Sequence, residues 1–72
     1  MSNSKEVFSF LCRCITATGT ELAAAYRDAG ERMSESDTPE AREANRRAMR
    51  LIDAIGKYRF ADWDTLLERA MA

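Results

Sequence analysis

Few side chains in this sequence have the types and spacing that catalysis or metal binding requires. Cys12 and Cys14 are the two cysteines, and the 72-residue chain contains no histidine. Positions two apart on a helix point about 200° from each other, so these thiols cannot bridge to each other or share a metal ion. Two small buried or half-buried thiols are the simpler interpretation, and a redox switch or an interchain disulfide is the alternative.

The usual groups for acid–base and nucleophilic catalysis are also missing. Without histidine, a cysteine nucleophile would need another basic partner, and the neighbouring Arg13 points elsewhere on a helix. Asp62 and Asp64 form a close acid pair, but helix capping and the helix dipole explain both. The sequence has no glycine-rich phosphate loop. We therefore expect a protein that is not an enzyme and that uses no cofactor and no metal ion.

A row of arginines is a candidate binding surface. Arg42, Arg46 and Arg50 recur every four residues, so they share one side of a helix, opposite its apolar residues. This row can dock onto phosphates or onto an acidic protein surface. It can equally be a solvated face on which the arginines pair with neighbouring acids such as Glu43 and Asp53. Both interpretations stay open at this point.

Aromatic residues near the carboxyl end supply a second candidate contact surface. Tyr58, Arg59 and Trp63 are of the types that dominate binding hot spots. In so small a protein, Phe60 and Trp63 can instead belong to the core. We expect Tyr58 and Arg59 to be partly exposed and Trp63 to be mostly buried, with a subunit boundary as one place for it. The predicted partner-binding set is Arg42, Arg46, Arg50, Tyr58, Arg59 and Trp63.

Hydrophobic periodicity predicts a long first helix over about residues 4–33. Apolar residues recur with near-heptad spacing from Phe8 to Met33, and they form one stripe along this helix. Gly19 interrupts the pattern, since glycine in a helix interior costs about 1 kcal/mol relative to alanine. Either the helix bends at Gly19 or another backbone approaches it closely.

Two shorter helices are predicted after the first. Thr38 and Pro39 have the types of a capping residue and a first helical residue, so a second helix is expected over about residues 39–55. Gly56 is its natural end. A third helix is expected over about residues 62–71, with its cap at the first of these positions. Residues 1–72 thus form a single all-α domain, in which a helical hairpin of the first two helices is followed by a short third helix.

The amino-terminal part of the first helix is apolar on two faces. Phe8, Leu11 and Ile15 lie on the main stripe, and Phe10 and Cys14 lie on a second patch roughly 140° away. One partner helix cannot cover both faces, and a chain of this length has a marginal core. We therefore expect a homodimer, and alanine substitutions on the main stripe should unfold the protein along with the dimer. The predicted interface residues are Phe8, Phe10, Leu11, Cys14 and Ile15.

Charge is unevenly distributed, although the net charge is only −1. Residues 20–41 contain six acids and two arginines, whereas residues 42–59 contain six bases and two acids. The acidic balance argues against a dedicated nucleic-acid binder. A helix-turn-helix motif fits poorly, because residues 30–38 would make its turn too long. A small DNA-binding transcriptional regulator that uses the arginine row remains the alternative function.

The amino terminus does not predict a signal peptide. Lys5 and Glu6 precede an apolar run that Ser9 and Arg13 interrupt. No stretch of the sequence has the length and apolar content of a membrane span. We therefore expect a cytoplasmic protein that makes no membrane contact.

Residues 6–33 resemble a family of small host-takeover proteins of temperate phages, the quorum-sensing anti-activators. The similar runs are Glu6-Val7-Phe8, Cys14-Ile15, Ala17-Thr18-Gly19 and Glu21-Leu22-Ala23-Ala24-Ala25. The resemblance implies a helical dimer in the host bacterial cytoplasm that binds a LuxR-type transcriptional activator and a type IV pilus assembly ATPase. It implies a non-enzymatic inhibitor that occludes its target, but it assigns no functional residue. A structural subunit of a larger assembly is a third possible role.

Overall fold

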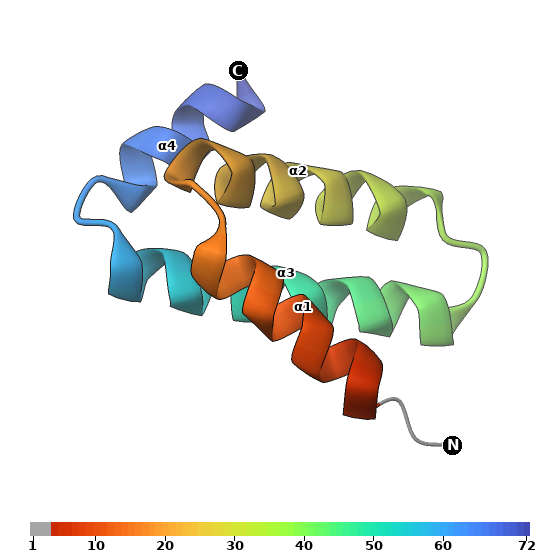
Figure 1. Cartoon of the computed structure of the whole chain (residues 1–72). Coiled ribbons are helices and arrows are strands. Elements are labelled where there is room, and N and C mark those ends of the chain that lie inside the picture. The colour runs from red at the N-terminus through yellow and green to blue at the C-terminus, as the bar shows by residue number, and fades with distance from the viewer. Residues whose placement is uncertain (1–3) are drawn as a thin grey trace.

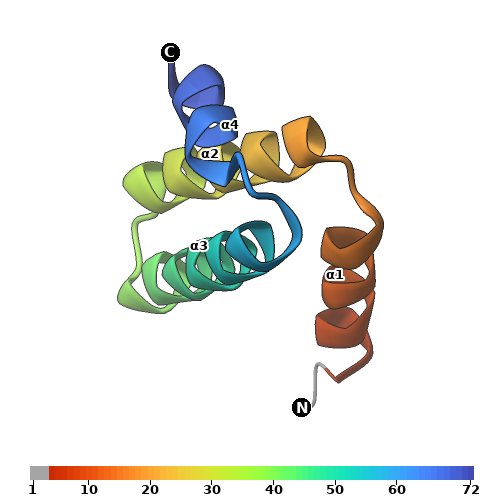
Figure 2. The ribbon, with the colours of Figure 1, turned by 90° about the vertical axis from the view of Figure 1, so that its left-hand side faces the viewer.

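The computed structural model describes residues 4–72, and every regular element in this range is an α-helix. The helices are α1 (Ser4–Thr16), α2 (Gly19–Glu35), α3 (Pro39–Arg59) and α4 (Trp63–Met71). Figure 1 shows α2 and α3 running antiparallel, with α4 beside α2. Figure 2 shows α1 as an arm that descends from the start of α2. The all-α prediction is confirmed, and no helix within the described range is long and apolar enough to cross a membrane.

The predicted single helix over residues 4–33 is wrong, because a new helix begins after Thr18. The Thr18 hydroxyl accepts the backbone N–H of Glu21 at 3.1 Å, and the Glu21 carboxylate accepts the backbone N–H of Thr18 at 2.8 Å. This complete capping box fixes the start of α2. Gly19 is its first residue, and a Cβ there would come within 2.6 Å of the Leu66 side chain on α4. Gly19 therefore lies at a break in the helix and also at a point where the Leu66 side chain approaches the backbone closely.

α3 begins where the sequence predicts and ends later. Thr38 caps its first turn, as expected. The predicted end at Gly56 is wrong, since the helix continues to Arg59. Gly56 is buried, and a Cβ at this position would overlap the indole ring of Trp63. This glycine therefore allows α4 to pack closely rather than ending the helix. Asp62 precedes α4 as predicted, although its side chain makes no capping hydrogen bond.

The core lies where α2, α3 and α4 meet, and one side of α1 joins it. Its buried residues are Cys14, Leu22, Ala23, Ile52 and Trp63. Trp63 is among the largest buried side chains, and its indole N–H donates to the Asp53 carboxylate at 2.9 Å. A buried tryptophan needs such a partner for its single polar group. The Trp63–Asp53 hydrogen bond therefore ties α4 to α3.

This hydrogen bond should make the stability of the fold depend on pH. Donation by Trp63 lowers the pKa of Asp53 below its ordinary value of 3.8, burial opposes this, and Lys57 lowers it further. The ionised carboxylate thus stabilises the fold above pH 3.8, and this contribution is lost as the pH falls through the lowered pKa. We expect urea unfolding to show a smaller loss of stability on acidification in Asp53→Asn than in the wild type. An equal loss in both would contradict this role for Asp53.

Candidate functional site

α1 packs one apolar face against the protein and leaves the other uncovered. Cys14 is buried in the core, and Phe10 packs against it. On the other side of the helix, Phe8 and Ile15 are 68% and 58% exposed. We define the outer face of α1 by its apolar residues Phe8, Leu11 and Ile15. The two faces expected from the sequence are therefore separate surfaces, and the chain itself covers only one of them.

Two residues of the predicted dimer interface belong to the inner face instead. Cys14 is 4% exposed, and burial raises the pKa of its thiol, with Arg13 and Arg59 opposing this shift. Phe10 is half-buried beside it. Neither side chain is on the side that a second copy would contact through the outer face. The predicted interface is thus reduced to Phe8, Leu11 and Ile15, while Cys12 is an exposed free thiol.

Arg59 holds α1 against α3. Its guanidinium donates to the backbone carbonyl of Cys14 at 2.6 Å. The same guanidinium lies 4.6 Å from the centre of the Phe60 ring, within the range of a cation–π contact. Arg59 is thus only partly exposed, as the sequence predicts, and its contact with a partner stays a prediction.

The arginine row defined by Arg42, Arg46 and Arg50 lies exposed along α3, as the sequence predicts. Arg46 pairs with Glu43 at 3.1 Å, in agreement with a solvated face. Arg42 donates to the backbone carbonyl of Ser36 at 3.1 Å. Arg50 makes no ion pair or hydrogen bond through its side chain within residues 4–72. The row thus combines one paired arginine, one that holds the α2–α3 turn, and one that is unpaired.

Tyr58 and Leu51 are exposed apolar residues on the side of α3 that faces solvent. Tyr58 is 92% exposed, and Leu51, seven residues before it, lies on the same side of the helix. An aromatic side chain with so little cover is a candidate contact residue. Trp63 differs, because at 2% exposure it is a core residue. Its predicted contact with a partner is therefore not available.

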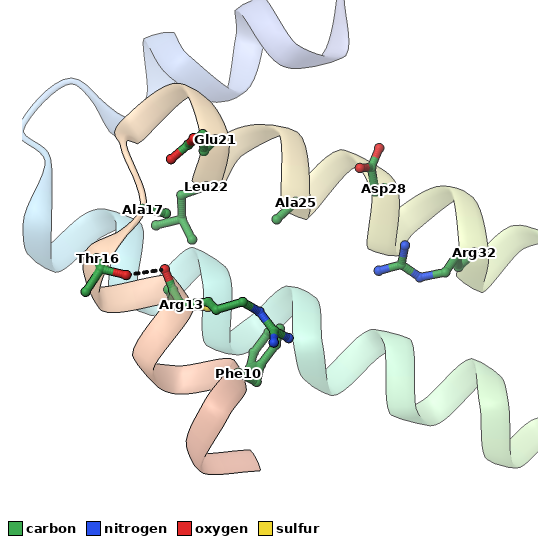
Figure 3. Close-up of a pocket in the computed structure, with 10 residues that line it drawn as sticks. Phe10, Arg13, Thr16, Ala17, Glu21, Leu22, Ala25, Asp28 and Arg32 are labelled. Atoms are coloured by element: carbon green, nitrogen blue, oxygen red, sulfur yellow. Dashed lines mark hydrogen bonds between the residues drawn. The ribbon is translucent and has the colours of Figure 1, made fainter. Parts of the chain in front are cut away.

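A groove separates α1 from α2, with a volume of about 570 Å³. Figure 3 shows Arg13 reaching along it from α1 and Arg32 extending toward it from α2. Its lining residues are Phe10, Arg13, Cys14, Thr16, Ala17, Glu21, Leu22, Ala25, Asp28 and Arg32. Sequence reasoning missed this groove, because a continuous helix over residues 4–33 cannot fold back on itself to form two walls.

The connection between α2 and α3 bears on the DNA-binding alternative. It comprises only residues 36–38, so the turn is shorter than the predicted one over residues 30–38. A turn of this length is compatible with a helix-turn-helix motif. The orientation of the two helices is what argues against this motif. α2 and α3 lie antiparallel, whereas the two helices of that motif cross at about 90–120°.

Comparison with known proteins gives no relative for this chain. No protein-family model matches it, and no curated protein or solved structure matches it significantly. Residues 4–72 contain no group of three or more His, Cys, Asp or Glu side chains that could hold a metal ion. The surfaces described above are therefore the basis for inferring what the protein does.

Proposed function

We propose that this protein is a non-enzymatic protein-binding inhibitor that acts as a homodimer. The observation that carries this proposal is the uncovered outer face of α1, on which Phe8 and Ile15 are more than half exposed. Exposed apolar residues that are contiguous, rather than scattered, are typical of interaction surfaces. The inhibitor would pair its two chains through this face and contact the DNA-binding surface of its target through the acidic residues 20–41. The arginine row and Tyr58 on α3 would contact acidic patches on a second target.

The total exposed surface supports a second subunit. A folded monomer of 8.1 kDa is expected to expose about 4500 Å². This chain exposes 5252 Å², which is larger by several hundred Å². A stable protein interface takes about 800 Å² from each partner. The excess is thus of the size that one dimer interface would remove.

The target is a host transcriptional activator of the LuxR type, with a type IV pilus assembly ATPase as a second one. The resemblance of residues 6–33 to quorum-sensing anti-activators supports this choice. Charge also supports it, since all four ion pairs among residues 4–72 join residues of the same helix. The exposed acids of residues 20–41 that make no ion pair or side-chain hydrogen bond within residues 4–72 can therefore attract a DNA-binding surface; they are Glu31, Glu35, Asp37 and Glu40. The mechanism is stoichiometric occlusion in the host cytoplasm.

A displacement assay tests this function. A LuxR-type activator bound to its operator DNA is titrated with the protein, and the bound fraction is followed by electrophoretic mobility shift. We expect displacement that is complete near one dimer per activator dimer. Glu31→Lys/Glu35→Lys should weaken displacement by about tenfold or more, because it reverses two exposed charges that attract the DNA-binding surface. Glu68→Lys, an exposed change of the same kind on α4, is the control, and an operator complex that persists at all concentrations would refute inhibition.

The DNA-binding alternative is favoured only by the unpaired Arg50 in the arginine row. It predicts that the protein alone shifts DNA and that this affinity falls steeply with salt, since several phosphate contacts would release counterions. A protein-binding inhibitor would not shift DNA on its own at any salt concentration. The same mobility-shift assay, run without activator from about 50 to 200 mM salt, separates the two functions.

A further inference from the structure

We propose that the groove between α1 and α2 binds an acidic amphipathic segment of another protein. The segment would place a bulky apolar side chain on the groove floor and a carboxylate between Arg13 and Arg32. This inference shares one assumption with the proposed function, namely that the protein binds other proteins. It adds a docking site that is separate from both the outer face of α1 and the arginine row.

The floor of the groove is apolar. Phe10 and Ala17 of α1 and Leu22 and Ala25 of α2 line it. Leu22 is fully buried, whereas Phe10 and the two alanines are only partly covered. The alanines leave room next to the larger side chains. An apolar side chain from outside can therefore be buried there, which is how a helix or an extended segment anchors in a groove.

The charges around this floor favour a negatively charged occupant. Glu21 and Asp28 lie at the rim, but both carboxylates are engaged within the chain. Glu21 accepts the Thr18 N–H in the capping box, and Asp28 accepts from Arg27 at 3.3 Å. The side chains of Arg13 and Arg32 make no ion pair or hydrogen bond within residues 4–72.

The two arginines approach the groove from opposite walls. Arg13 comes from α1 and Arg32 from the last turns of α2, and Figure 3 shows both side chains extended along the groove. Two unpaired guanidinium groups beside an apolar floor suit a carboxylate, which can accept paired hydrogen bonds from each. Charge complementarity thus identifies the occupant as a segment with an Asp or Glu close to a large apolar residue.

The open shape of the groove favours a protein segment over a small molecule. Its volume of about 570 Å³ lies along the surface between two helices rather than in an enclosed cavity. Small-molecule sites bury most of their ligand, whereas peptide grooves leave one side of the segment in solvent. Because the groove is on the inner side of α1, it can be filled while the outer face of α1 is covered by a second chain.

A displayed library of random 14-residue peptides, selected on the wild-type protein, tests this site. We expect the enriched peptides to carry Asp or Glu three or four positions from a large apolar residue. A synthetic copy of the best peptide should bind at least tenfold more weakly to Arg13→Glu/Arg32→Glu. It should bind within about twofold to Lys5→Glu/Arg69→Glu, which makes the same change in net charge at exposed positions of α1 and α4. Arg13→Gln/Arg32→Gln serves as a milder variant, and circular dichroism checks that all variants fold.

Several outcomes would overturn the proposal. These are a selection that enriches no peptide, enriched peptides without an acid, and equal binding by both double variants. The proposal would also be overturned if NMR titration with the peptide changed chemical shifts on α3 or on the outer face of α1 instead of along the groove. Failure of the groove is distinguishable from failure of the inhibitor function, because the displacement of a LuxR-type activator from DNA is measured without the peptide.

Discussion

Gly56→Ala is expected to destabilise the protein by about 1–3 kcal/mol, which is a large part of the stability of so small a domain. Helix propensity alone predicts the opposite sign, since alanine is favoured over glycine by about 1 kcal/mol in a helix interior. The added Cβ would overlap the Trp63 indole, whose ring is rigid and held by its hydrogen bond to Asp53. α4 would have to move away from α3 to make room. Urea unfolding followed by circular dichroism measures the loss.

Gly30→Ala is the matched control for this prediction. Gly30 also lies inside a helix, but a Cβ there would meet the end of the flexible Met49 side chain at 3.3 Å. We expect this variant to be neutral or more stable by up to about 1 kcal/mol. Equal changes in stability for both glycine variants would contradict the claim that Gly56 is needed for the close packing of Trp63.

Phe8→Gln/Ile15→Gln is expected to convert the dimer into folded monomers. Burial of a large apolar side chain contributes about 1.5–3 kcal/mol, and in a twofold symmetric dimer each substitution acts twice. A partner can bury only the exposed part of each side chain, which is 68% for Phe8 and 58% for Ile15. The double variant should therefore weaken association by about 4–7 kcal/mol, or about three to five orders of magnitude in Kd. Because both side chains are already exposed in the single chain, the monomer should keep its helix content.

This expectation changes what the sequence alone predicts for these positions. Substitutions at Phe8 or Ile15 should not unfold the chain, whereas Leu11 is half-buried and its truncation should affect both folding and association. Light scattering coupled to size exclusion measures the mass, and far-ultraviolet circular dichroism measures the helix content. Leu51→Gln/Tyr58→Gln removes exposed apolar surface from α3 instead. A monomer produced by this control as readily as by the α1 variant would place the interface elsewhere.

Local patterns in the sequence predict the helical class, the Thr38 cap and the two apolar faces of α1. They do not reveal the break at Thr18, although Thr18 and Glu21 have the spacing of a capping box. The apolar stripe continues nearly in phase across the break, because only residues 17 and 18 lie outside the helices. Periodicity alone therefore cannot separate one bent helix from two.

Contacts between distant parts of the chain account for the remaining differences. Gly56 has the residue type of a helix end, but its role depends on Trp63, which lies on another helix. Arg59 has the residue type of a hot spot, yet its guanidinium donates a hydrogen bond to the Cys14 carbonyl within the chain. The exposure of the arginine row and of Tyr58 follows from helical spacing, so the sequence predicts it. The groove depends on the angle between α1 and α2, which no local pattern determines.

Sedimentation equilibrium of the wild-type protein tests most directly whether the outer face of α1 is a dimer interface. The proposed homodimer predicts a mass of twice the 8.1 kDa chain at micromolar concentration, with a return to the single-chain mass in Phe8→Gln/Ile15→Gln. A wild-type mass of 8.1 kDa up to millimolar concentration would contradict it. The outer face of α1 would then be free in solution and would have to serve the target rather than a second copy of the chain.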